Sequence, residues 1–199
     1  MPSLVLYGSN IPDSTLVAAC DMAAASGGVE TSATTTTTGT NNFVEVFSQN
    51  GSSTGFSALQ APSGKGWAFK PGAGTFALGN WSASIALSLA LSPGTGSLYI
   101  LRFYKYSGGI YSAIGTINSG TISASGRTAA SFPATSMPAT TFTATDILYI
   151  DLYWEEVSGT IGGDNPTVFV STSSTAGVVG DMQVTTSTFT PLAADASTS

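Results

Sequence analysis

The chain has 199 residues, of which 42% are hydrophobic and only 8% are charged, and its formal net charge is −6. Such a chain is too apolar to be disordered, and its five cations form no basic stripe for nucleic acid or for an anionic membrane surface. It contains no histidine and one cysteine, which excludes histidine-based catalytic triads, histidine- or thiolate-ligated zinc and internal disulfides.

Alternation of apolar and polar residues predicts β-strands along most of the chain. Residues 81–91 alternate most regularly, and residues 98–106 and 110–117 flank a Ser-Gly-Gly turn that predicts a hairpin. Residues 14–25 are the one stretch that could form a short helix. Further strands are expected at residues 4–7, 31–36, 43–47, 66–69, 129–132, 140–144, 147–155, 167–171 and 182–190.

Many short strands at this spacing predict an all-β fold, a two-sheet antiparallel sandwich like a jelly roll, with at most one short helix near the N-terminus. A Greek-key sandwich of another topology is the alternative. We expect residues 1–40 to form an N-terminal arm with the short helix and an edge strand. Residues 41–190 are expected to form the sandwich domain, and residues 191–199 a flexible C-terminal tail.

No catalytic, cofactor or metal site is predicted, and we do not expect an enzyme. Asp151 and Glu155 face the same side of one strand, but at a rise of about 3.3 Å per residue they lie roughly 13 Å apart. Glycosidase carboxylate pairs need about 5–9.5 Å. Glu156 points the other way or starts a loop, so Asp151, Glu155 and Glu156 are interpreted as a solvated strand end. Residues 162–166 could offer oxygen ligands to calcium, but Asp164, Asn165 and Pro166 are more typical of a turn.

Aromatic residues are the feature that could mark a ligand. Trp81 and Trp154 share the apolar phase of their strands and are expected in the core. Tyr149, Asp151 and Tyr153 lie on the mixed face of residues 147–155, where exposed rings could stack on a sugar or contact a partner. Core packing or a subunit interface is the favoured interpretation, and a sugar platform is the alternative.

Residues 66–155 resemble β-sandwich modules of bacteriophage virion proteins, such as capsid decoration (cement) and tail-associated proteins. The resemblance lies in Gly-Trp-Ala-Phe at residues 66–69, Gly-Thr-Phe at 74–76, Gly-Asn-Trp at 79–81, the strand at 98–106 with its Gly-Gly hairpin, and Thr-Asp-Ile-Leu-Tyr-Ile-Asp-Leu at 145–152. It covers just under half of the chain, and no functional residue can be carried over from it.

The resemblance and the composition together predict a virion structural protein, most specifically a capsid decoration or cement protein. The expected partners are a major capsid protein or other virion subunits and further copies of the chain, with no nucleic acid and no membrane. No secretory signal is visible, because the first cation is Lys65, so assembly in the host cytoplasm is expected. The alternatives are a carbohydrate-binding β-sandwich module and a tail or fibre component that binds a cell-surface glycan.

Overall fold

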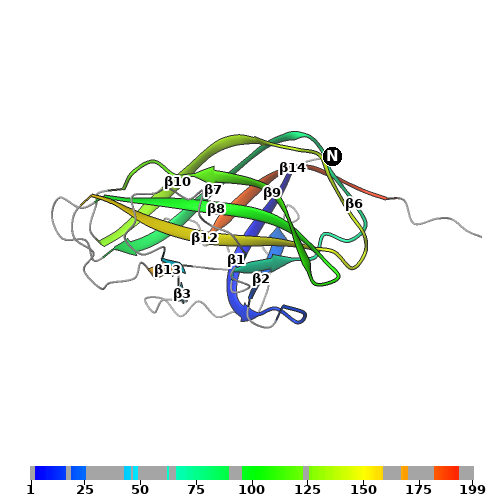
Figure 1. Ribbon diagram of the computed structural model, residues 1–199, viewed down its shortest axis with the longest axis horizontal. Coiled ribbons are helices and arrows are strands. Elements are labelled where there is room, and N and C mark those ends of the chain that lie inside the picture. Colours follow the sequence, from blue (N-terminus) through cyan, green and yellow to red (C-terminus); the bar gives the residue numbers. More distant parts are fainter. Residues whose placement is uncertain are drawn as a thin grey trace, which may run out of the picture.

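A computed structural model describes residues 3–16, 19–25, 43–45, 47–48, 62, 66–89, 96–122, 126–158, 167–169 and 182–192. Within these residues the fold is all-β and contains no helix, which confirms the all-β part of the predicted fold (Figure 1). The strands are β1 (Ser3–Pro12), β2 (Cys20–Ala25), β3 (Phe43–Glu45), β4 (Phe47–Ser48), β5 (Trp67–Phe69), β6 (Gly74–Phe76), β7 (Gly79–Leu89), β8 (Gly96–Ser107), β9 (Ile110–Asn118), β10 (Gly126–Met137), β11 (Thr140–Phe142), β12 (Ile147–Ser158), β13 (Thr167–Phe169) and β14 (Gln183–Pro191).

The strand pairs follow one continuous path in the order β3-β13-β7-β14-β1-β2-β5-β12-β8-β9. Strand β10 pairs with β7, β4 pairs with β12, and β6 joins β11 to the end of β14. Strand β9, at one end of this path, lies against β10, which is attached through β7 near the other end. The sheet therefore curls into a nearly closed, barrel-like body rather than lying open (Figure 1).

The main core fills the inside of this body. It takes side chains from strands all along the path, including β7, β8, β9, β10, β12 and β14. The predicted alternation is observed over residues 81–85, where Trp81, Ala83 and Ile85 are buried and the serines between them are partly exposed. It ends at Ala86, which is buried as well. Trp81 is fully buried and donates its indole N–H to the Ser187 hydroxyl, 2.9 Å away. The prediction that Trp81 belongs to the core is confirmed.

A second, smaller cluster lies on the outer side of β12, β8 and β5. Its buried members are Ala19, Ala68, Tyr104, Ile147 and Tyr149, and Leu16, Tyr106 and Tyr111 pack against it. Ile147 and Tyr149 are fully buried on this side, and Leu148 and Ile150 are fully buried on the other. Strand β12 is therefore covered on both faces, which a half-buried strand of an open sandwich would not be.

The helix predicted within residues 14–25 is wrong, because residues 20–25 form strand β2. Asp13 accepts hydrogen bonds from the backbone N–H groups of Thr15 and Leu16, at 2.7 and 2.6 Å, and so turns the chain instead of starting a helix. Strand β2 then pairs with β1 and β5, and this pairing overrides the helix propensity of its alanines.

The ends of the chain contribute to the sheet. Leu6 on β1 is fully buried, and β1 lies between β2 and β14, so residues 3–12 of the predicted arm are built into the body. Strand β14 ends at Pro191, and the N–H of Leu192 donates to the Ala73 carbonyl at 3.0 Å. Residues 26–40 and 193–199 of the predicted arm and tail lie outside the described residues, as does the strand predicted at 31–36.

The hairpin predicted at the Ser-Gly-Gly turn is confirmed. Gly108 and Gly109 have φ angles of 55° and 91°, which glycine adopts without strain, and Tyr106 pairs directly with Tyr111 across the turn. Strand β6 was not predicted, because its three residues follow Pro71 and Gly72 in a stretch typical of a turn. This short strand joins the end of β14 to β11.

Candidate functional site

The three predicted contact residues lie side by side on β12. Tyr149, Asp151 and Tyr153 share one face of the strand, as the alternation predicted. Tyr149 and Asp151 have no exposed surface and Tyr153 is 4% exposed. The structure therefore brings the three residues together inside the molecule, and they do not form an exposed platform for a sugar ring. The prediction of a solvated strand end is wrong for Asp151, because other segments cover this face of β12.

Each oxygen of the Asp151 carboxylate accepts a hydrogen bond from a tyrosine hydroxyl. The Tyr149 hydroxyl donates to one carboxylate oxygen, and the Tyr153 hydroxyl donates to the other at 2.6 Å. The Tyr149 hydroxyl also accepts a hydrogen bond from the backbone N–H of Gly66 at 2.9 Å. This Tyr-Asp-Tyr network gives both oxygens of the buried carboxyl group hydrogen-bond partners, without which its burial would be costly.

Glycine is needed at residue 66, where the chain enters β5 beside the network. A Cβ atom there would clash with the Ile150 carbonyl and lie 2.9 Å from an Asp151 carboxylate oxygen. The close approach of the backbone allows the Gly66 N–H to reach the Tyr149 hydroxyl. From the sequence, Gly66 was predicted only as the first residue of a strand, and no contact with Tyr149 or Asp151 was predicted.

The surroundings of Asp151 keep its partner Tyr153 protonated. Burial, and after it the hydrogen bond to Asp151, raises the pKa of Tyr153 far above its usual range. Arg102 is the residue directly opposite Asp151 on the neighbouring strand β8, and its guanidinium carbon lies 5.5 Å from the centre of the Tyr104 ring. The pKa of Tyr104 is raised as well, because the effect of burial outweighs the opposing effect of the Arg102 charge.

Tyrosine rings extend the network towards the surface. The Tyr111 ring lies 5.1 Å from that of Tyr149 and 4.8 Å from that of Tyr106, measured between ring centres. Burial raises the pKa of Tyr111 as well. Tyr106 and Tyr111 are partly exposed, so they are the members of this group that a ligand could reach. They were not predicted from the sequence as ligand contacts, although their direct pairing follows from the hairpin register.

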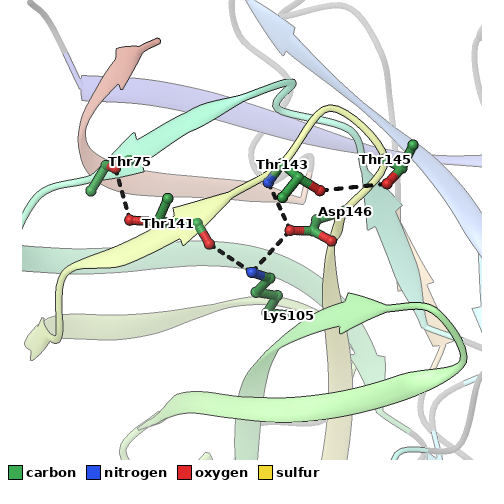
Figure 2. Close-up of polar contacts among 6 residues, drawn as sticks. All are labelled: Thr75, Lys105, Thr141, Thr143, Thr145 and Asp146. Carbon is green, nitrogen blue, oxygen red and sulfur yellow. Dashed lines mark hydrogen bonds and ion pairs between the residues drawn. The ribbon is translucent and has the colours of Figure 1, made fainter.

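A second polar network lies at the turn between β11 and β12 (Figure 2). The Lys105 ammonium group lies 2.9 Å from the Asp146 carboxylate and donates to the Thr141 carbonyl at 2.8 Å. Asp146 also accepts a hydrogen bond from the Thr143 N–H at 2.7 Å. Burial alone would raise the pKa of Asp146, but hydrogen bonds from Thr143, Ser107 and Lys105 outweigh it and hold the pKa well below its usual range.

Several sequence predictions fall outside the part of the chain that the structure describes. They concern residues 162–166 and the side chains of Trp154, Glu155 and Glu156. Among the described residues, no three His, Cys, Asp or Glu side chains are grouped so that they could hold a metal ion. None of the described elements is a helix that is long and apolar enough to cross a membrane.

The chain was compared with family models, curated proteins and solved structures, and none of the three comparisons finds a match. The two networks therefore have to be interpreted from their own geometry.

Proposed function

We propose that this chain is a structural subunit of a bacteriophage particle, and specifically a decoration or cement protein on the outside of the shell. One observation supports a structural role without catalysis. Both oxygens of the buried Asp151 carboxylate are bonded to tyrosine hydroxyls, and the residue has no exposed surface. A carboxylate in this state holds strands in place and is out of reach of a substrate.

The mechanism of a cement protein is mass action. A subunit that binds the assembled shell, but not its free components, stabilises the assembled state by its binding free energy. The weakly charged surface suits this role, because 8% charged residues leave much of the exterior to hydroxyl and small apolar side chains that can be buried at an interface. A jelly-roll-like sandwich, a homo-oligomer and assembly in the host cytoplasm are parts of the same proposal.

The test is the copy number of this chain in purified particles, measured by quantitative mass spectrometry. A copy number comparable to that of the major shell protein supports decoration. A handful of copies per particle moves the chain to the tail or a fibre. Absence from particles overturns the proposal.

A carbohydrate-binding module is the second candidate, and one observation favours it. Tyr106 and Tyr111 are partly exposed, their rings lie 4.8 Å apart, and the Tyr111 ring packs against the buried Tyr149. Such a pair could stack on a sugar ring. Titration with a panel of glycans would then quench tyrosine fluorescence saturably, and Tyr111→Ala would abolish the quenching while Tyr7→Ala, at a partly buried tyrosine on β1, would not. Quenching that is absent with every glycan would remove this candidate.

A further inference from the structure

Two tyrosine side chains lie side by side next to the turn of the β8–β9 hairpin. Tyr106 and Tyr111 pair directly across the two strands, one pair of residues away from Gly108 and Gly109. Residues directly opposite each other have Cβ atoms about 4.5–5.5 Å apart on one face of the sheet, so the two rings leave the sheet in the same direction. The ring centres lie 4.8 Å apart and the ring planes are inclined by 56°. The edges of the two rings are therefore in van der Waals contact.

Tyr106 and Tyr111 are also the members of the tyrosine group that a reagent in solution can reach. Both are partly exposed, whereas Tyr104 is 4% exposed and Tyr149 has no exposed surface. The tryptophan and methionine side chains that the structure describes, which are also easily oxidised, are buried: Trp67, Trp81, Met22, Met137 and Met182. An oxidant in solution therefore reaches the Tyr106–Tyr111 pair before the buried aromatic and sulfur side chains.

Tyr111 has two other tyrosine neighbours, and packing holds both of them in place. The Tyr149 ring is 5.1 Å away but inclined by 64°, and its hydroxyl is bonded to Asp151. The Tyr104 ring is 6.2 Å away and inclined by 82°. Both rings are buried in close-packed surroundings, so turning either towards Tyr111 would disturb the packing. Tyr106 is partly exposed, and its ring can turn about a soft terminal torsion.

We propose that Tyr106 and Tyr111 form a dityrosine cross-link within the chain when a one-electron oxidant, such as a haem peroxidase with hydrogen peroxide, acts on it. Each phenol loses one electron and one proton and becomes a phenoxyl radical. The two radicals join through a bond between ring carbons ortho to the hydroxyls, and the hydrogen on each of these carbons moves to its phenol oxygen. Two electrons and two protons leave the pair, and hydrogen peroxide takes them up to form two molecules of water.

The cross-link gives this hairpin a covalent bond that cysteine cannot supply. The chain has a single cysteine and so forms no internal disulfide. Because the loop that the bond closes is short, the entropic gain in stability is small. The main effect is that β8 and β9 can no longer separate beside the turn. This inference goes beyond the proposed function and does not depend on it, because it concerns chemistry within one chain.

The experiment treats the folded chain with a haem peroxidase and hydrogen peroxide. Dityrosine fluorescence follows the reaction, and mass spectrometry of tryptic peptides locates the bond. Trypsin cleaves after Lys105 and Arg127, so peptide 106–127 contains Tyr106 and Tyr111 and no other tyrosine. This peptide should become lighter by two hydrogen atoms, and its fragmentation should give no ions from cleavage between residues 106 and 111.

The same peptide map distinguishes the other possible partners of Tyr111. A bond to Tyr104 would attach peptide 103–105 to peptide 106–127, and a bond to Tyr149 would attach the C-terminal peptide 128–199. A bond between two chains would give a dimer on a denaturing gel. Any of these as the main product overturns the inference, as does a folded chain that forms no dityrosine under conditions that cross-link free tyrosine.

Matched variants test whether the fold prepares the pair. Tyr106→Phe and Tyr111→Phe should each abolish the loss of two hydrogen atoms from peptide 106–127. Tyr7→Phe, at a partly exposed tyrosine on β1, is the control and should react like the parent chain. Circular dichroism establishes that each variant is folded. The yield should fall when the parent chain is unfolded in urea, because the register of the hairpin is lost. An equal yield in urea would show that closeness in the sequence is sufficient, and the inference would fail.

Discussion

Asp151 and Asp146 are both almost completely buried, yet the structure stabilises the two carboxylates in different ways. Asp151 lies on the outer side of β12 and accepts from two neutral tyrosine hydroxyls that are themselves buried. Asp146 lies in a turn at the surface and is held by a backbone N–H and by Lys105, whose side chain is 26% exposed. The first network is sealed, and the second is in contact with solvent on one side.

The difference shows what each network can contribute to stability. Removing one member of the sealed network leaves buried polar groups that water cannot reach. The full desolvation penalty of these groups then lowers the free energy of unfolding. In the Lys105–Asp146 network, water can replace a lost partner, and ion pairs near the surface contribute little on their own. We therefore expect substitutions around Asp151 to be the most destabilising and those around Asp146 to depend on pH.

The largest effect is expected for Asp151→Ala. It leaves the hydroxyls of Tyr149 and Tyr153 buried without their acceptor, which should lower the free energy of unfolding by about 3–5 kcal/mol. Asp151→Asn retains one carbonyl acceptor and should lose less. Urea denaturation followed by tryptophan fluorescence measures both. A loss below about 1 kcal/mol for Asp151→Ala would mean that water reaches the network, since exposed hydrogen bonds contribute about that much.

Gly66→Ala tests whether the close approach of the backbone to β12 is needed. The new methyl group would clash with the Ile150 carbonyl and crowd the Asp151 carboxylate, which should cost about 2–3 kcal/mol in the free energy of unfolding. Gly120→Ala is the matched control, because a Cβ atom at that exposed glycine would meet no atom within 4 Å. Equal stability of the two variants would show that the segment at Gly66 can move away from β12.

The two tyrosines of the sealed network should not be equivalent. Tyr149→Phe removes the bond to Asp151 and also leaves the Gly66 N–H unpaired, so it should cost about 2–3 kcal/mol. Tyr153→Phe removes one bond to Asp151 and should cost about 1–2 kcal/mol. Urea denaturation of the two variants under the same conditions makes the comparison. The reverse order would contradict the role assigned to Gly66.

Part of this arrangement could be predicted from the sequence. The alternation in residues 147–155 correctly put Tyr149, Asp151 and Tyr153 on one face, because the period of a strand is a local property. It could not show that this face is covered. The cover includes Leu16 and Ala19, from a turn that was expected to be helical, and Ala68 from β5. Which distant segment covers a strand is decided by tertiary pairing.

The Lys105–Asp146 pair and strand β6 could not be predicted from the sequence for a related reason. Lys105 reaches Asp146 because β8 and β12 pair in one particular register, in which Tyr106 lies opposite Ile147. Strand β6 has only three residues and carries almost no sequence signal of its own. It forms because the ends of β14 and β11, which are distant in the sequence, pair with it on its two sides.

The smallest effect, and the one that most sharply separates the two carboxylates, is the response of Asp146 to acid. Its pKa in the folded state lies below the ordinary aspartate value of about 3.9, so ionised Asp146 stabilises the fold above that pH, and this contribution is lost as the pH falls below it. Asp146→Asn should therefore cost about 1–2 kcal/mol at pH 7, where the carboxylate is paired with Lys105 and the Thr143 N–H. The difference in the free energy of unfolding between Asp146→Asn and the parent chain should shrink as the pH falls from 4 towards 2.

Urea denaturation at a series of pH values measures this difference. Lys105→Met should show a weaker form of the same trend, because the bond from the Thr143 N–H to Asp146 remains. A difference between Asp146→Asn and the parent chain that stays constant from pH 7 to pH 2 would mean that the carboxylate acts through its shape and not through its charge.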